Sequence, residues 1–203
     1  MIDSYHTVRG EASIELKRKA SRFKGEVYPA KTVEMARVQL EAVRKREHAA
    51  THHCYAWRVG MPGEEQFKYS DDGEPSGSAG RPIYDALCGR DLTNTLVVVT
   101  RYYGGTKLGT GGLVRAYGDA ASEALEKAGK IECFITGRFK VTVEFSLYDQ
   151  LIKLLSASGV KPVESDFTDK VTLIVEVRLS REEALKDEIV GLSSGKAAIE
   201  KLA

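Results

Sequence analysis

The sequence predicts an α+β protein built of two domains. Stretches with a helical period alternate with short runs of β-branched and aromatic residues, so neither kind of element dominates. The pattern restarts around residues 129–137, and the remainder reads strand, helix, strand, strand, helix, strand. A length of 203 residues suits one large domain or two small ones, each able to bury a core. We place the domains at residues 1–135 and 136–203.

The elements of the first domain follow from polarity and from glycine positions. Residues 12–30 alternate loosely in polarity and predict two strands, and residues 33–45 place apolar side chains among charges and predict an amphipathic helix. The run TLVVVTRYY at 95–103 predicts a buried central strand. The other predictions are a strand at 52–59, a loop at 61–80 with one short strand at 67–70, and helices at 81–89 and about 111–128.

The second domain has a simpler pattern. We predict strands at 138–146, 160–167, 171–179 and 197–202, and helices at 148–157 and 181–192. This βαββαβ order is that of the ferredoxin-like split βαβ motif, which is complete in about 65 residues.

Composition excludes several classes of protein. With 30 Lys plus Arg against 29 Asp plus Glu, the net charge of +1 supplies no global field toward nucleic acid or an anionic membrane, so any basic site is local. Apolar runs fall short of a membrane span, and the first residues do not resemble a signal peptide. Cys54, Cys88 and Cys133 show no disulfide or zinc pattern and are expected to be buried thiols. We expect a cytoplasmic protein with no membrane partner, no metal site and no cofactor.

The densest unusual stretch is RYYGGTKLGTGGLVRAYG at 101–118, which holds basic residues, tyrosines and glycines but no acid. It is not a Walker A loop. A strand there feeds a glycine loop and a helix start, a natural anion site, and tyrosines can stack on bases. The alternative is a tight turn with core tyrosines, but five glycines in nine positions exceed what one turn demands. The candidate nucleic-acid or phosphate-binding residues are Arg101, Tyr102, Tyr103, Gly104, Gly105, Lys107, Gly109, Thr110, Gly111, Gly112, Arg115 and Tyr117.

Two further stretches supply candidate residues that line the same cleft. On the strand HHCYAW, alternation sends His52 and Cys54 to one face and His53 and Tyr55 to the other, which disfavours joint chelation of a metal and favours packing or hydrogen-bonding roles. The loop at 69–82 is acidic and rich in small residues. Its carboxylates could hold Mg²⁺, but we expect instead that they pair with Arg81, Arg101 or Arg115. The cleft-lining candidates are His52, His53, Asp71, Asp72, Glu74 and Arg81.

Three motifs together, HHCYAW at 52–57, SDDGEPSGSAGRP at 70–82 and RYYGGTKLGTGGLVRAY at 101–117, resemble the IMPACT/YigZ family of the two-domain bacterial type. The resemblance covers nearly the whole chain. It implies an IMPACT domain similar to ribosomal protein S5 domain 2, followed by a ferredoxin-like domain similar to domain V of elongation factor G. The relatives of both domains bind ribosomal RNA, and eukaryotic family members regulate translation.

We therefore expect a translation-associated regulatory protein that binds RNA, the ribosome or a nucleotide at the basic glycine-rich loop. One alternative is a protein–protein regulator of translation with no small ligand, in which the loop is only architecture. The other is an enzyme acting on a phosphate substrate, with Asp71, Asp72 or Glu74 holding Mg²⁺ and Lys107 stabilising the transferred group. We expect an enzyme less than a binding protein.

Overall fold

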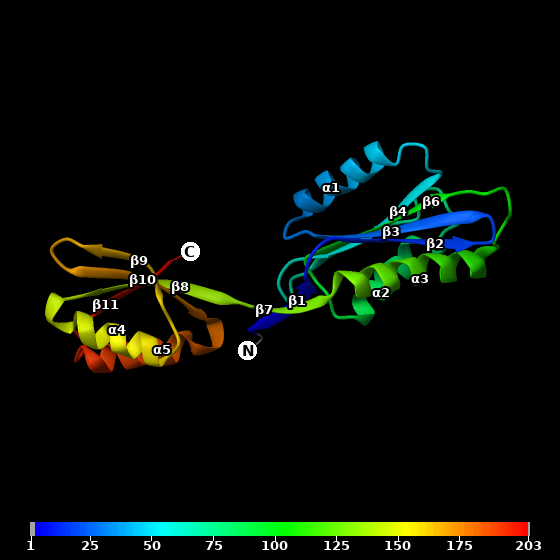
Figure 1. Cartoon of the computed structure of the whole chain (residues 1–203). Coiled ribbons are helices and arrows are strands. Elements are labelled where there is room, and N and C mark those ends of the chain that lie inside the picture. Colours follow the sequence, from blue (N-terminus) through cyan, green and yellow to red (C-terminus); the bar gives the residue numbers. More distant parts are fainter. Residues whose placement is uncertain (1–2, 203) are drawn as a thin grey trace. The chain divides into compact units, whose positions relative to one another are not determined.

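The computed structural model describes residues 3–202, and the chain forms two compact units. One unit comprises residues 5–133, and the other comprises residues 134–202 with the first described residues. Figure 1 shows helices and sheets in both units. The mixed α+β class is thus confirmed, and each unit is described below by itself.

A five-stranded antiparallel sheet organises the unit of residues 5–133. Its strand order is β2-β3-β6-β4-β5, so β6 lies at the centre (Figure 1). Residues 95–101 of β6 are all buried, as the uninterrupted apolar run predicts. The strands are β2 (Ala12–Arg18), β3 (Ser21–Pro29), β4 (His52–Val59), β5 (Gln66–Ser70) and β6 (Thr95–Tyr102).

Three helices cover the two faces of this sheet. Helix α1 (Val33–Arg46) lies on one face, and α2 (Gly80–Gly89) and α3 (Thr110–Ala128) lie on the other (Figure 1). The side chain of Thr32 accepts a hydrogen bond from the Met35 N–H and so fixes the start of α1. Strand alternation gives each helix layer its own apolar core. Every element predicted for residues 12–128 is present within a few residues of its expected bounds.

A two-stranded ladder formed by β1 (Ser4–Val8) and β7 (Lys130–Phe134) is absent from the sequence predictions. Both strands are short, and most of their residues are half-buried or exposed. Their pairing joins segments more than 120 residues apart, so no local pattern identifies it.

The unit of residues 134–202 has the βαββαβ order and the strand order β11-β8-β10-β9. This is the arrangement of the ferredoxin-like motif. The inward residues of β8 and β10 alternate with half-exposed ones and pack against α4 and α5 in an apolar core. The elements are β8 (Thr136–Val143), a short 3-10 helix (Phe145–Leu147), α4 (Tyr148–Ala157), β9 (Pro162–Phe167), β10 (Val171–Arg178), α5 (Leu179–Leu192) and β11 (Ala198–Lys201).

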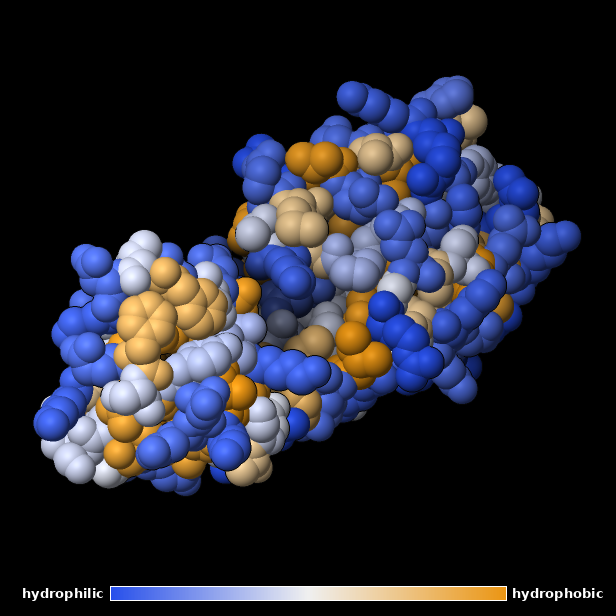
Figure 2. Space-filling view, turned by 60° about the vertical axis from the view of Figure 1, so that its left-hand side comes forward, coloured by the Kyte–Doolittle hydropathy of each residue, from blue (hydrophilic) through white to orange (hydrophobic). Residues whose placement is uncertain are grey.

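The surface is that of an ordinary globular chain. On the face shown in Figure 2, hydrophilic side chains predominate and apolar ones are scattered among them. None of the helices within residues 3–202 is long and apolar enough to cross a membrane. Cys54 is buried as predicted, whereas Cys88 and Cys133 are half-buried.

Candidate nucleic-acid and phosphate site

Neighbouring strands of the central sheet bring three side chains of the site together. His52 on β4 and Phe23 on β3 are both cross-strand partners of Arg101 on β6. Directly paired residues share a face of a sheet, so these side chains all point toward the α3 layer. His53, Thr100 and Tyr102 point the other way, as the alternation of HHCYAW predicts.

Arg101 and Glu74 form a buried ion pair beneath this face. The distance from Arg101 Nη1 to Glu74 Oε1 is 2.6 Å, and the two side chains are 6% and 4% exposed. The Tyr117 hydroxyl donates to the same carboxylate oxygen at 2.8 Å, and Arg101 Nη2 donates to Ser21 Oγ at 3.2 Å. The expected pairing of the acidic loop with an arginine is therefore present. The Nε of Arg101 is buried and finds no partner among the described residues.

The acidic loop is held in place by its first carboxylate. Asp71 accepts hydrogen bonds from the backbone N–H groups of Gly77, Ala79 and Gly80, at 2.8 to 2.9 Å. Burial raises the pKa of Asp71, but the three N–H donors outweigh this effect, and the net pKa lies below its usual value. The Cys54 thiol donates to the Asp71 carbonyl at 3.0 Å, and burial raises the pKa of that thiol. Cys54 is thus a structural thiol that fixes the loop rather than a nucleophile.

A cavity of about 530 Å³ lies above the buried ion pair. The strand end, the acidic loop and the glycine-rich loop all contribute to its wall. Seven of the predicted site residues line it together, namely His52, Glu74, Arg101, Tyr103, Lys107, Gly109 and Thr110. Its lining also includes Thr51, Pro75, Leu108 and Leu113, which are not among the residues predicted from the sequence. Leu108 and Leu113 lie on either side of the helix start at Thr110. An apolar residue on each side of a predicted helix start is the sequence signal that could have identified them.

The start of α3 faces this cavity without a cap of its own. Gly109 precedes the helix with a φ of 75°, and no side chain accepts from the first turn. The first turn also contains no acidic residue. The N–H groups of a first helical turn lack backbone partners, so an anion can bind there.

The glycines of the loop have mostly internal explanations. A Cβ on Gly104 would lie 1.9 Å from the Ala20 carbonyl oxygen, and one on Gly112 would lie 3.2 Å from Leu108 Cβ. Gly105 and Gly109 have positive φ. A Cβ on Gly111 would instead meet no atom of the chain within 4 Å. The number of glycines is therefore weaker support for a ligand than the sequence suggested, and only Gly111 has no internal reason for its missing side chain.

Several predicted site residues do not line the cavity. Tyr117 is fully buried and bonded to Glu74, so its ring is not available for stacking, and burial raises the pKa of its hydroxyl. Tyr102 lies on the α1 face, where its hydroxyl donates to Glu47 at 2.6 Å and Arg22 stacks on its ring. His53 also lies on that face. Arg81 pairs with Asp85 at 2.7 Å, and Arg115 is exposed on α3.

The three carboxylates of the acidic loop are engaged separately. Asp71 binds backbone N–H groups, Asp72 lies near Arg44 and accepts from the His53 N–H, and Glu74 binds Arg101. Within residues 3–202, no group of three His, Cys, Asp or Glu side chains is placed to hold a metal ion. The phosphoryl-transfer alternative therefore lacks a preformed carboxylate cluster.

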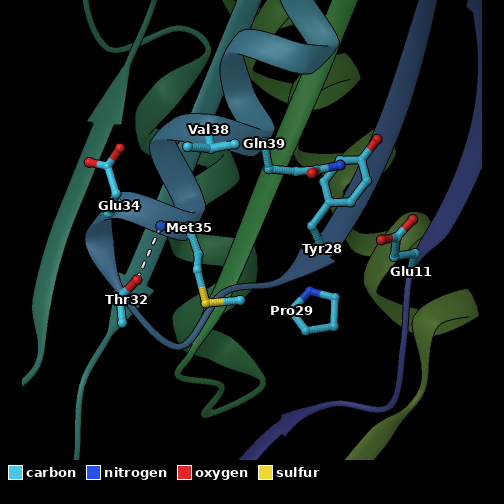
Figure 3. Close-up of a pocket in the computed structure, with 8 residues that line it drawn as sticks. All are labelled: Glu11, Tyr28, Pro29, Thr32, Glu34, Met35, Val38 and Gln39. Atoms are coloured by element: carbon cyan, nitrogen blue, oxygen red, sulfur yellow. Dashed lines mark hydrogen bonds between the residues drawn. The ribbon is translucent and has the colours of Figure 1, made fainter.

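A second cavity, of about 380 Å³, lies against α1 and is less suited to an anion (Figure 3). Figure 3 shows Met35 and Val38 on the helix, with Tyr28 and Pro29 across from them. Its charged lining residues, Glu11 and Glu34, are both acidic. The lining of this cavity therefore offers an anion no cationic side chain.

The chain is similar to known proteins along nearly its whole length. The family model of the Impact N-terminal domain matches residues 19–125, and that of a domain of unknown function (DUF1949) matches residues 141–196. The IMPACT family member YvyE of Bacillus subtilis is 33% identical over 201 residues, which cover 99% of this chain and 92% of that protein. YigZ of Escherichia coli is 34% identical over 178 residues, 87% of each chain. A crystal structure of a hypothetical protein has a TM-score of 0.72 at 30% identity and covers 100% of this chain and 99% of its own.

Proposed function

Because the chain belongs to the IMPACT family, we propose that it is a cytoplasmic, translation-associated protein that binds RNA in the cavity at the start of α3. Family membership implies a role related to the regulation of translation. RNA, on the ribosome or free, is then a ligand whose chemistry suits this cavity. The proposal concerns the unit of residues 5–133.

The observation that carries the proposal is the convergence of cationic and aromatic groups on one uncapped helix start. Lys107 and Arg101 line the cavity beside Gly109 and Thr110, and Tyr103 contributes an aromatic ring that is 45% exposed. Lys107 is exposed, and the described part of the chain places no carboxylate within ion-pair distance of its ammonium group. In the proposed complex, Lys107 and the N–H groups of the first turn of α3 contact a phosphate, and Tyr103 stacks on a base.

Arg101 has a supporting role in this proposal. Its guanidinium is tied to Glu74 and Ser21, which leaves only Nε without a partner. Arg101 also lies over the Phe23 and Tyr103 rings, with its Cζ at 5.4 and 5.2 Å from their centroids. It therefore holds Tyr103 in place, while its own charge is balanced by the Glu74 carboxylate.

The test is fluorescence anisotropy of labelled single-stranded and structured RNA at two salt concentrations. We expect wild-type binding to weaken as salt rises, because phosphate contacts release counterions. Lys107→Ala is expected to weaken binding by about tenfold and to reduce the salt dependence by about one counterion. Lys161→Ala, an exposed lysine of the other unit, is the matched control and is expected to bind as wild type does.

Two results would contradict the proposal. RNA that does not bind at low salt would remove RNA as the ligand, and so would binding that is indifferent to Lys107. The protein–protein alternative would then be favoured, because a regulator whose loop is only architecture keeps its partner when Lys107 is replaced.

A further inference from the structure

We infer that the cavity distinguishes ribose from deoxyribose, and that His52 Nε2 accepts a hydrogen bond from the 2′-hydroxyl of the bound nucleotide. The inference rests on the proposed function and adds a specificity-determining residue to it. It depends on the tautomer of one histidine and on what a sugar–phosphate backbone can donate.

The tautomer of His52 is set by the acidic loop. His52 Nδ1 lies 2.8 Å from the carbonyl oxygen of Asp72, and a carbonyl oxygen can only accept. Nδ1 therefore carries the hydrogen and donates it. In the neutral ring, Nε2 then has a free lone pair and is an acceptor.

The carbonyl that orients His52 is itself fixed. The Asp72 side chain accepts from the His53 N–H at 2.6 Å and lies 3.3 Å from Arg44 Nη2, while its own N–H donates to Ser70 Oγ at 3.2 Å. Asp72 has a φ of 44°, an uncommon conformation for a residue other than glycine. These contacts hold Asp72 in place, so the hydrogen on Nδ1 is a stable feature of the loop, and Nε2 is the acceptor in the neutral ring.

Within residues 3–202, His52 Nε2 has no hydrogen-bond donor opposite it. His52 lines the cavity with its side chain 20% exposed, and the carboxylate oxygen Glu74 Oε1 lies 3.9 Å from Nε2. That oxygen already accepts from Arg101 and Tyr117. Two acceptors therefore lie side by side at the cavity wall, and a ligand that brings a hydroxyl hydrogen there gains a bond that an acceptor would not.

The 2′-hydroxyl is the group of RNA that meets this requirement. The phosphate oxygens and ester oxygens of a nucleic-acid backbone only accept hydrogen bonds, and the 2′-hydroxyl is the backbone donor that separates RNA from DNA. Lys107 and the α3 start attract the phosphate in the same cavity, which brings the adjacent sugar near His52. An N–H group of a base is the competing donor, and the test must separate the two.

The experiment compares labelled oligouridine, oligodeoxyuridine and 2′-O-methyl oligouridine of equal length by fluorescence anisotropy. We expect the wild type to bind the RNA about five- to tenfold more tightly than either analogue, the effect of one unmade hydrogen bond. His52→Phe, which keeps a ring but has no acceptor, is expected to lose that preference and to bind the deoxy oligomer as wild type does. His48→Phe, a change at an exposed histidine, is the control and should retain the preference.

Each result decides the matter. Equal affinity for RNA and DNA would overturn the ribose inference and leave the proposed RNA binding intact, whereas no binding of either would overturn both. A preference that survives His52→Phe, or that changes when adenine or cytosine replaces uracil and not when the sugar changes, would assign His52 no role at the 2′-hydroxyl. If His52→Phe does not fold, as judged by circular dichroism, the ¹⁵N resonance of His52 Nε2 in the wild type gives the answer. It should shift more with the RNA than with the DNA oligomer, and equal shifts would contradict the inference.

Discussion

The two faces of the five-stranded sheet each hold a cluster of charged and aromatic side chains, and they differ in the kind of group that is left unpaired. Among the described residues, the α1 face leaves the carboxylate oxygen Glu26 Oε2 and the hydroxyl Thr100 Oγ1 buried without a partner, but no cation of its cluster. On the α1 face, Lys24 binds Glu47 at 2.6 Å, Arg46 binds Glu26 at 2.6 Å, and Tyr102 donates to Glu47. The cations of this cluster are all paired.

On the α3 face the same kinds of residue line an open cavity. Among the described residues Arg101 Nε has no partner, His52 Nδ1 lies 2.8 Å from the Asp72 carbonyl oxygen, and Lys107 is exposed beside the helix start. The same residue types therefore form two different environments. The clusters differ in whether the fold leaves a cationic group without a partner.

The largest effect is expected from breaking the buried ion pair of the α3 face. Arg101→Met leaves the Glu74 carboxylate buried without its cation, and removal of one partner of a buried pair costs about 3 to 5 kcal/mol. We expect a fall of that size in the free energy of unfolding, measured by urea denaturation. Arg138→Met, at an exposed pair with Glu176, is the control and should cost less than about 1 kcal/mol. Similar losses in the two variants would show that the Arg101 pair is not a special support of the site.

The ion pairs of the α1 face should make the stability of the protein depend on pH in the acidic range. The hydrogen bond from Lys24, with further donors, lowers the pKa of Glu47 from 4.5 to about 2. A carboxyl group whose pKa is lower in the folded than in the unfolded chain stabilises the fold at pH values above its unfolded pKa. This stabilisation is lost as the pH falls from about 4.5 to about 2. It amounts to on the order of 2 to 3 kcal/mol. Glu47→Gln should therefore lose less stability than wild type between pH 5 and pH 2 in urea titrations, and parallel losses would contradict the assigned pairing.

Alanine substitutions at Gly104, in the loop, and at Gly111, in the first turn of α3, are expected to change the free energy of unfolding by smaller amounts and in opposite directions. Gly104→Ala places a Cβ against the Ala20 backbone and is expected to cost about 1 to 3 kcal/mol of unfolding free energy. Gly111→Ala meets open space in a helix and should raise it by about 0.5 to 1 kcal/mol. If a phosphate approaches the first turn of α3, the same Gly111→Ala change weakens RNA binding while the protein becomes more stable. Thermal melting and anisotropy on both variants would check this, and unchanged RNA affinity in Gly111→Ala would place the phosphate elsewhere.

Local pattern predicted most of the fold. The period of residues 33–45, the apolar run at 95–103 and the glycine at 129 are each signals carried by adjacent residues, and the corresponding elements are present. The β1–β7 ladder was missed because it depends on pairing between the two ends of one unit.

The composition of the site was predicted more completely than its geometry. Strand alternation correctly placed His52 and His53 on opposite faces of the sheet. The same alternation places Tyr102 on the face away from the cavity, but the prediction for Tyr102 did not take it into account. Tyr117 was a candidate for stacking on a base, with packing in the core as the alternative, and its position on α3 places it in the core. The pairing of Glu74 specifically with Arg101 and Tyr117 requires the loop and the strand to be folded together, so no spacing in the sequence identifies it.

The most direct test of the contrast between the two faces is backbone NMR of the ¹⁵N-labelled chain during titration with single-stranded RNA. The account predicts that the amides of His52, Lys107 and residues 109–112 shift together and saturate at one affinity. It predicts no comparable shifts for Lys24, Arg46 or Glu47 on the α1 face. Shifts concentrated on the α1 face, or confined to residues 134–202, would contradict the assignment of the binding site to the start of α3.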